Sequence, residues 1–472
     1  MRPSLRFALF AVLSLTLCSA IAAFAQKTAS DPEATAAVAG GQADFKNPIS
    51  PTDVTKTQPT QLTIGSNVVI DADTGAVEGL SSSGAINTAA GRTPAVGNDD
   101  NLVFGKVRHT PPGGNIDGLD TLATFQGAFA AQAGPNTGNV FKFTMVGNPP
   151  LAGDTTVIPY RISEVSLVLL NADGTVLTTV PFAPFEQLTL ESPNFEPLDY
   201  RSGRNLEYGD AVHRAQFFNR MAPDWHTVLV PHLVNRVTIT VPRFVNVRLS
   251  NGTIIQARSY FIGTAADGST FVLMLNLLFN LFFGNEVVNE INLGNFTTNA
   301  LNTTMFPNTF LFSLNVNNPN TPGGCCVLGF HTFFFDPSVT PQPRWVTAYA
   351  SWISPGLFGA GFQDVTALSH ETAEEFGNPF LDNAAPNWQF PGQPANSKVC
   401  QNNLEEGDPI EVLPNATIPI TVKEGKFQFT YHPQNIPLLQ WFEMGPTSNA
   451  IDGAFSFPDE TVLPHSAVPC PQ

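Results

Sequence analysis

The sequence contains few charged residues, and positively charged residues are the scarcest. Charged residues make up 13% of its 472 residues, and 22 Lys and Arg stand against 39 Asp and Glu, which gives a formal net charge of −17. A protein that binds nucleic acid needs a basic surface to neutralise phosphates. The acidic balance therefore argues against nucleic acid as a partner.

Long apolar runs and several common catalytic motifs are also missing. The most apolar stretch after the N-terminal segment, FVLMLNLLFNLFF at 271–283, is too short to span a membrane and is interrupted by Asn276 and Asn280. We expect a buried strand or core segment there and no membrane span. The chain has no GxSxG elbow, Walker loop or dinucleotide-binding glycine loop, which argues against the corresponding hydrolases and nucleotide-binding proteins.

The N-terminal segment predicts export. Residues 1–25 contain Arg2 and Arg6, then an apolar stretch, then Ala23-Phe24-Ala25, which is the pattern of a secretory signal peptide and its cleavage site. We expect cleavage near Ala25 and a secreted or periplasmic protein. Lipid attachment at Cys18 is a weaker interpretation, because Leu17 stands where a small residue is needed.

Cysteine is scarce, and the four cysteines after the signal peptide predict disulfides. An even number in an exported chain favours disulfides over free thiols, and the absence of any CxxC spacing argues against a zinc site made of cysteines. Three pairings are open. Because a bond between neighbouring cysteines would be strained, we expect Cys325 and Cys326 each to pair with Cys400 or Cys470.

Many short strands joined by turns are indicated by 37 Gly, 40 Pro and 38 Phe. Residues 26–120 are expected to be a weakly ordered lead-in rich in Ala, Gly and Asn, and 121–472 a β-rich domain. Turn sequences between β-branched runs predict hairpins within 164–182 and 236–262. Further strands are expected at 309–316, 327–335 and 345–353, and helices at 207–221 and 364–380. The expected fold class is α+β, a β-rich mixed sheet with few helices.

The helix at 364–380 carries the sequence HETAE, which resembles a metal-binding motif. His370 and Glu374 lie four residues apart and therefore on one helix face. Glu371 would lie beside an ion held between them, where its carboxylate can take a proton from a water that the ion activates. This is the geometry of the HExxH helix of zinc hydrolases, with glutamate in place of the second histidine. We expect Thr366 or Ser369 to cap the helix.

Such a site needs a third protein ligand and an open position, and the loop NLEEGDP at 403–409 offers one. We choose Glu405, because it has a long reach and follows the apolar Leu404. Asp408 is the second choice, since a carboxylate between Gly and Pro usually accepts backbone hydrogen bonds in a turn. Zinc is the expected ion, with other divalent metals as alternatives; calcium is disfavoured by the histidine.

The alternative interpretation is a solvated acidic helix face with an ordinary surface histidine. Glu375 is an extra acid that the metal interpretation leaves without a role. His331, within the apolar strand CCVLGFHTFF, is expected to be a core histidine with a satisfied hydrogen bond or, as an alternative, a group that orients a substrate.

Several blocks of the chain resemble one group of proteins. The blocks ALSHETAEEFGNPF, CQNNLEEGDP and YHPQNIPLLQWFE, with CCVLGFH and YGDAVHRAQFF upstream, are similar to exported bacterial proteins common in acidobacteria. A more distant similarity is to the plant phosphate-induced (exordium) proteins. The resemblance implies a zincin-like core, with His370, Glu371 and Glu374 on the helix and Glu405 and Asp408 in the loop.

The function expected from these patterns is that of an exported metal-dependent hydrolase, most simply a peptidase acting on a peptide or another extracellular substrate. Glu371 would be the general base, and His370, Glu374 and Glu405 the metal ligands. The alternative is an extracellular binding or surface protein on a zincin-like scaffold, with a structural or vestigial site.

Overall fold

A computed structural model describes residues 60–63, 68–73, 77–78, 95–96 and 121–470. Within the last range it leaves out 200–204, 219, 336–342, 360, 394–399, 425–426, 446–456, 458–459 and 467–469. The predicted signal peptide, residues 1–25, lies outside the described residues.

A mixed sheet forms the centre of the fold. Its strand order is β1-β11-β7-β16-β20-β19-β4, and β8 pairs with β7 beside this path. Neighbouring strands from β1 to β20 run parallel, whereas β19 is antiparallel to both β20 and β4. The strands are β1 (Thr60–Thr63), β4 (Ala95–Val96), β7 (Thr155–Leu170), β8 (Val176–Val180), β11 (His226–Val241), β16 (Leu301–Pro307), β19 (Gly329–Phe335) and β20 (Arg344–Trp352). The predicted fold class, α+β with a β-rich mixed sheet, is confirmed.

Apolar side chains of this sheet pack into two separate cores. On β7, Ile158 and Ile162 pack into a core that includes Leu368 and Phe376 of helix α5 (Thr366–Gly377). The other core contains Val165, Leu167 and Leu169 of β7, together with residues of helix α4 (Asn276–Asn292). The site helix α5 therefore lies on the sheet rather than at its edge.

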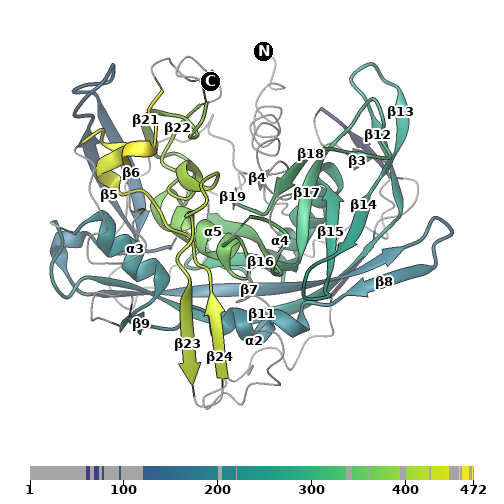
Figure 1. Ribbon diagram of the computed structural model, residues 1–472, viewed down its shortest axis with the longest axis horizontal. Helices are drawn as coiled ribbons and strands as arrows, with labels where there is room; N and C mark the ends of the chain where they lie inside the picture. Colours follow the sequence, from purple (N-terminus) through teal and green to yellow (C-terminus); the bar gives the residue numbers. More distant parts are fainter. Residues whose placement is uncertain are drawn as a thin grey trace.

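Smaller sheets and hairpins surround this centre (Figure 1). One four-stranded sheet has the order β13-β12-β2-β3 and another the order β14-β15-β17-β18, and four two-stranded hairpins complete the set. Their strands are β2 (Val69–Asp71), β3 (Val77–Glu78), β5 (Thr124–Ala130), β6 (Val140–Val146), β9 (Leu198–Asp199), β10 (Asn205–Leu206), β12 (Phe244–Arg248), β13 (Ile254–Arg258), β14 (Tyr260–Thr264), β15 (Thr270–Leu275), β17 (Thr309–Leu314), β18 (Pro322–Val327), β21 (Ala384–Trp388), β22 (Gln401–Asn403), β23 (Ile420–Glu424) and β24 (Phe427–Tyr431). The remaining helices in the described part are α2 (Ala183–Leu190), α3 (Tyr208–Gln216) and α6 (Leu439–Phe442), with short 3-10 turns at Pro150–Ala152, Asp408–Ile410 and Glu460–Val462. The predicted hairpins correspond to β7–β8 and β12–β13.

The apolar stretch 271–283 is a core segment, as one of the two predicted alternatives has it, but only its first half is a strand. β15 ends at Leu275, and α4 begins at Asn276. Leu278, Phe279 and Phe282 recur at helical spacing and are fully or almost fully buried. The asparagines that interrupt the apolar run therefore belong to a helix with one strongly apolar face. Helix α2, which has a proline in its first turn, was not predicted.

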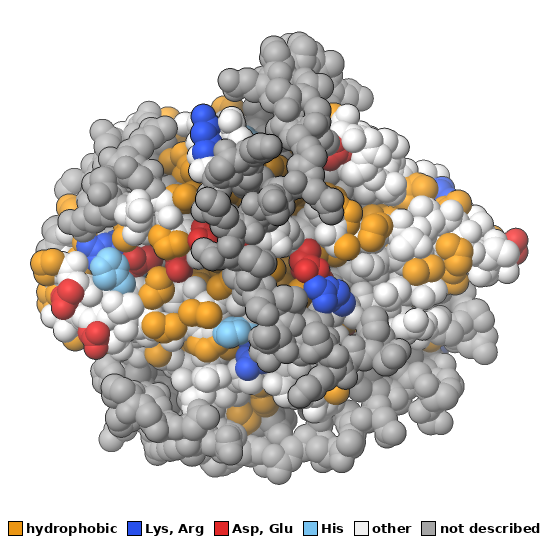
Figure 2. All heavy atoms as spheres, turned by 90° about the horizontal axis from the view of Figure 1, so that it is seen from below, with side chains coloured by type: hydrophobic (Ala, Val, Ile, Leu, Met, Phe, Trp, Pro, Cys, Tyr) orange, Lys and Arg blue, Asp and Glu red, His pale blue; other side chains and the backbone are white. Residues whose placement is uncertain are grey.

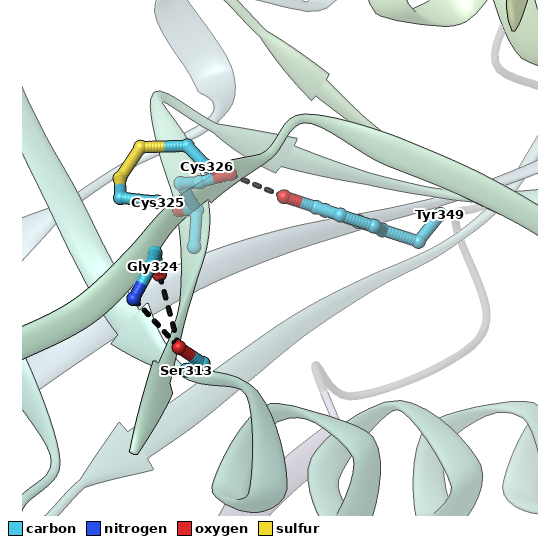
Figure 3. Close-up of a disulfide and its surroundings, with 6 residues drawn as sticks. Ser313, Gly324, Cys325, Cys326 and Tyr349 are labelled. Carbon is cyan, nitrogen blue, oxygen red and sulfur yellow. Dashed lines mark hydrogen bonds between the residues drawn. A yellow bond between two sulfur atoms is a disulfide. The ribbon is translucent and has the colours of Figure 1, made fainter. Parts of the chain in front are cut away.

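The four cysteines form two disulfides, as predicted, but the predicted pairing is wrong. Cys325 pairs with its neighbour Cys326, and Cys400 pairs with Cys470. The two pairs lie in different parts of the fold. Cys325 and Cys326 lie on β18 and pack partly against the two cores of the central sheet. Cys400 and Cys470 are buried beside β22. Figure 3 shows the vicinal pair beside Tyr349, whose hydroxyl donates a hydrogen bond to the carbonyl of Thr309.

Strands from the predicted lead-in, residues 26–120, join the sheets of the domain. β1 pairs in parallel with β11 and β2 in parallel with β12, whereas β4 is antiparallel to β19; β3 pairs with β2. These are the parts of the lead-in that the structure describes.

The described helices include none long and apolar enough to cross a membrane. Figure 2 shows few charged side chains on one face, separated by apolar and uncharged ones, as the low charge content leads one to expect.

Candidate metal site

Helix α5 positions the central residues of the site. It packs against β19 and β20 on one side and α3 on another, and every residue from Thr366 to Gly377 except His370 is buried. The approach to α3 is close: a Cβ at Gly209 would lie 2.9 Å from the Phe376 ring. The predicted helix is confirmed and ends at Gly377, before the predicted stop sequence is complete.

The predicted cap of this helix is wrong. Val365 occupies the cap position without a side-chain hydrogen bond, because the helix begins one residue later at Thr366. The Thr366 hydroxyl donates to carbonyls that include that of His432, and the Ser369 hydroxyl donates to the carbonyl of Thr366. The Asp364 carboxylate accepts the backbone N–H of Val365 instead.

His370, Glu374 and Asp408 form the outer group of the site. His370 Nε2 lies 3.1 Å from Glu374 Oε1 and 3.5 Å from Asp408 Oδ1. The three ligand atoms lie within 4.8 Å of one another and could hold a metal ion. The side chains of His370 and Asp408 are 12% and 21% exposed, so this group lies where the site reaches solvent.

His331, Glu371 and Glu374 form the inner group. His331 Nδ1, from β19, lies 3.3 Å from Glu374 Oε2 and 3.8 Å from Glu371 Oε2. All three side chains are buried, and their ligand atoms could also hold a metal ion. Sequence reasoning did not place His331 among the ligands, because its apolar flanks are those of a core strand; the CCVLGFH block was the one signal for it.

Both histidines are oriented by a hydrogen bond at the ring nitrogen opposite the one that faces Glu374. His370 Nδ1 lies 3.0 Å from Gln434 Oε1, and the Gln434 amide in turn donates to the Gly407 carbonyl at 2.6 Å. His331 Nε2 lies 3.0 Å from the carbonyl of Asn378. Since both partners are acceptors, these nitrogens carry the protons. His370 Nε2 and His331 Nδ1 are then the nitrogens that would give their lone pairs to a bound ion, as metal-ligating histidines do.

The two loop acids lie in different parts of the site. Asp408 completes the group of His370 and Glu374, and its Oδ2 accepts a side-chain hydrogen bond from Gln401 at 2.6 Å rather than backbone ones. Glu405 Oε1 instead accepts from Asn378 Nδ2 at 2.9 Å, and its Oε2 lies 3.8 Å from His331 Nε2. The structure therefore groups the second-choice acid with His370 and Glu374, and the first-choice acid with His331.

The loop 404–408 is held firmly against the helix. Leu404 is fully buried, as predicted, and the Cys400–Cys470 disulfide fixes the strand that precedes the loop. The backbone N–H of Gly407 donates to Glu374 Oε1 at 3.2 Å. A Cβ at Gly407 would lie 2.5 Å from His370 Nδ1, so only glycine lets the loop approach this closely.

Negative charge is in excess around the two imidazoles. Glu371, Glu374, Glu375, Glu405 and Glu406 are all buried. Burial raises the pKa of Glu371, Glu405 and Glu406 well above the ordinary range, and raises that of Glu375 to about 8. Burial would also raise the pKa of Glu374, but the flanking His370 and His331 hold it below its usual value. Buried acids this dense need protons or cations between them.

Four of these acids, Glu371, Glu375, Glu405 and Glu406, have an oxygen without any hydrogen-bond partner. Glu371 Oε2 and Glu405 Oε2 are both fully shielded from solvent and accept no hydrogen bond. Both face His331, at 3.8 Å from Nδ1 and Nε2 respectively. An unpaired buried carboxylate oxygen is costly, and a bound cation would remove that cost.

No family model, curated protein or solved structure matches the chain.

Proposed function

We propose that the protein is an exported metal-dependent hydrolase that cleaves peptide bonds. The observation that carries the proposal is the outer group, where His370, Glu374 and Asp408 converge at the partly exposed end of the site beside the buried Glu371. Export is supported by the composition of residues 1–25. The same proposal includes a zincin-like core and the resemblance of the site blocks to the acidobacterial proteins. The helix that carries the HETAE motif supports it.

The donor set fits a divalent ion, with zinc as the first choice. Zinc lies about 2.0–2.2 Å from nitrogen and oxygen ligands in tetrahedral geometry, which places the donors roughly 3.4 Å apart. The separations of 3.1 and 3.5 Å from His370 Nε2 to its two acids agree with this. One imidazole with two carboxylates suits zinc and other transition metals better than calcium.

A bound divalent ion would polarise the substrate carbonyl and make an adjacent water more acidic. Glu371 Oε1 lies 4.0 Å from His370 Nε2, so its carboxylate can receive a proton from a water placed at the outer group. The hydroxyl part of that water adds to the carbonyl carbon. Glu371 then returns the proton to the leaving amine as the C–N bond breaks. Water is the one co-reactant, and its atoms end in the new carboxyl and amino groups.

The proposal is tested with Glu371→Gln, which keeps the shape of the side chain and removes its basicity. The matched control is Glu375→Gln, the same substitution at another buried glutamate of α5 that belongs to neither group of candidate ligands. Both variants of the full chain are loaded with zinc and assayed on a mixed library of quenched fluorescent peptides. We expect cleavage by the wild type and the control, and none by Glu371→Gln. Undiminished cleavage by Glu371→Gln would refute the mechanism.

A second candidate is an extracellular binding or surface protein in which the ion is structural. The burial of most of the site favours it, because only His370 and Asp408 among the candidate ligands are more than slightly exposed. Under this alternative, removing the ion lowers the thermal midpoint of unfolding, while the loaded protein cleaves no peptide in the library.

A further inference from the structure

We propose that the centre holds two divalent ions, with the carboxylate of Glu374 between them. This inference rests on the proposed function, since it requires that the site bind metal. The inner ion would be held by His331 Nδ1, Glu371 Oε2 and Glu374 Oε2, and the outer ion by His370 Nε2, Asp408 Oδ1 and Glu374 Oε1.

Glu374 is the residue that the two groups share, and it uses a different oxygen in each. Oε2 faces His331 at 3.3 Å, and Oε1 faces His370 at 3.1 Å. Both separations are close to the roughly 3.4 Å expected between two ligands of one tetrahedral ion. The histidines themselves do not fall into a common ligand group among the described residues. Two ions therefore fit this pattern better than one ion placed between the two imidazoles.

The orientation of each imidazole supports the same arrangement. His370 Nδ1 and His331 Nε2 are satisfied by the acceptors Gln434 and Asn378, so the opposite nitrogens meet the carboxylate oxygens of Glu374 at 3.1 and 3.3 Å. A proton or a metal ion must lie in each of these contacts, and an ion takes the place of the proton when it binds. On the inner side, Glu371 Oε2 is buried and accepts no hydrogen bond, so it is available as a further ligand of an ion.

The two positions differ in access, which assigns them different roles. The inner side chains are 2 to 6% exposed, whereas His370 and Asp408 are 12% and 21% exposed. The outer ion would meet the substrate, and the inner ion would exchange slowly and hold Glu371 in place through Oε2. Oε1 of Glu371 would stay turned toward the outer group.

The first experiment counts ions in the full chain. Protein stripped with chelator is dialysed against zinc and analysed by mass spectrometry of the metal, for the wild type, His331→Gln and the control His465→Gln. His465 is a histidine that bonds to the carbonyl of Trp441, and it belongs to neither ligand group. We expect two ions in the wild type and the control and one in His331→Gln, with circular dichroism confirming that each protein is folded.

The other outcomes separate the two proposals. One ion in the wild type overturns the two-ion centre and leaves the proposed function standing. No ion overturns both. Two ions in a folded His331→Gln variant also overturn the inference, because the second ion would then lie elsewhere.

The second experiment needs no variant. The wild type is loaded with Mn²⁺ and examined by electron paramagnetic resonance. Ions in two-metal sites lie about 3.5–4 Å apart, so a carboxylate-bridged pair gives a coupled multiline spectrum. A six-line spectrum of isolated Mn²⁺ at saturation would overturn the proposal.

Discussion

Replacing Gln434 tests whether the outer group is built to bind metal. Gln434 is fully buried and touches no proposed ion, but its Oε1 fixes His370 Nδ1 and its amide holds the Gly407 carbonyl at 2.6 Å. Gln434→Met keeps the length of the side chain and removes both hydrogen bonds. His370 is then free to turn its lone pair away from the acids.

The expected magnitude follows from these two contacts. Loss of an orienting partner of a ligating histidine lowers metal affinity about 10–100-fold, which is roughly 1.4–2.7 kcal/mol. The Gly407 carbonyl and the His370 N–H also lose their partners, at about 1–3 kcal/mol of unfolding free energy for each buried group. Only the affinity for the outer ion should fall, because His331 is oriented by Asn378 rather than by Gln434.

Affinity is measured by competition with a chromophoric chelator, and unfolding by urea titration of the stripped protein. Gln389→Met is the matched control, since Gln389 is also buried and its amide donates to the carbonyl of Gln393 rather than to a site residue. The reasoning is refuted if Gln434→Met is folded and binds zinc as tightly as the wild type.

Three further predictions concern the acids and a glycine. Asp408→Ala should lower the affinity for the ion at the exposed end of the site, and Glu405→Ala the affinity for the more buried ion. Chelator competition that shows the reverse order would restore Glu405 as the partner of His370. Gly407→Ala should displace the His370 ring, because a Cβ would lie 2.5 Å from Nδ1, and should lower zinc affinity more than 10-fold; an unchanged affinity contradicts this close contact. Burial raises the pKa of Glu207 to about 8 from an ordinary 4.5, so the stabilising contribution of its protonated form is complete below pH 4.5 and is lost as pH rises toward 8. Urea titrations from pH 5 to 8 should therefore show that Glu207→Gln loses less stability than the wild type. Parallel stability curves for the two proteins would contradict the pKa shift.

Local patterns predicted the elements of the fold, because they depend on neighbours in the sequence. The hairpin β12–β13 has its Asn-Gly turn, and α5 has its helical spacing and its stop sequence. Local patterns did not predict the structure of the stretch 271–283, because β15 passes directly into α4 inside one apolar run. The register of parallel strands such as β7 and β16 joins residues far apart in the chain, and no local pattern specifies it.

The same distinction applies to the site. His370, Glu371 and Glu374 could be predicted because one helix turn brings them together. The choice between Glu405 and Asp408 depended on how a loop folds back over that helix. His331 comes from β19, whose apolar neighbours conceal its position beside α5. The cysteine pairing was wrong because Cys325 and Cys326 lie together on β18 and bond to each other, whereas Cys400 and Cys470, 70 residues apart, meet elsewhere in the fold.

The central claim is that His370, Glu374 and Asp408 bind a metal ion. Crystals of the full chain grown with zinc allow an anomalous difference map to be calculated from data at the zinc absorption edge. We expect a peak bounded by His370 Nε2, Glu374 Oε1 and Asp408 Oδ1. A map with no peak at that point, from crystals saturated with zinc, would contradict it.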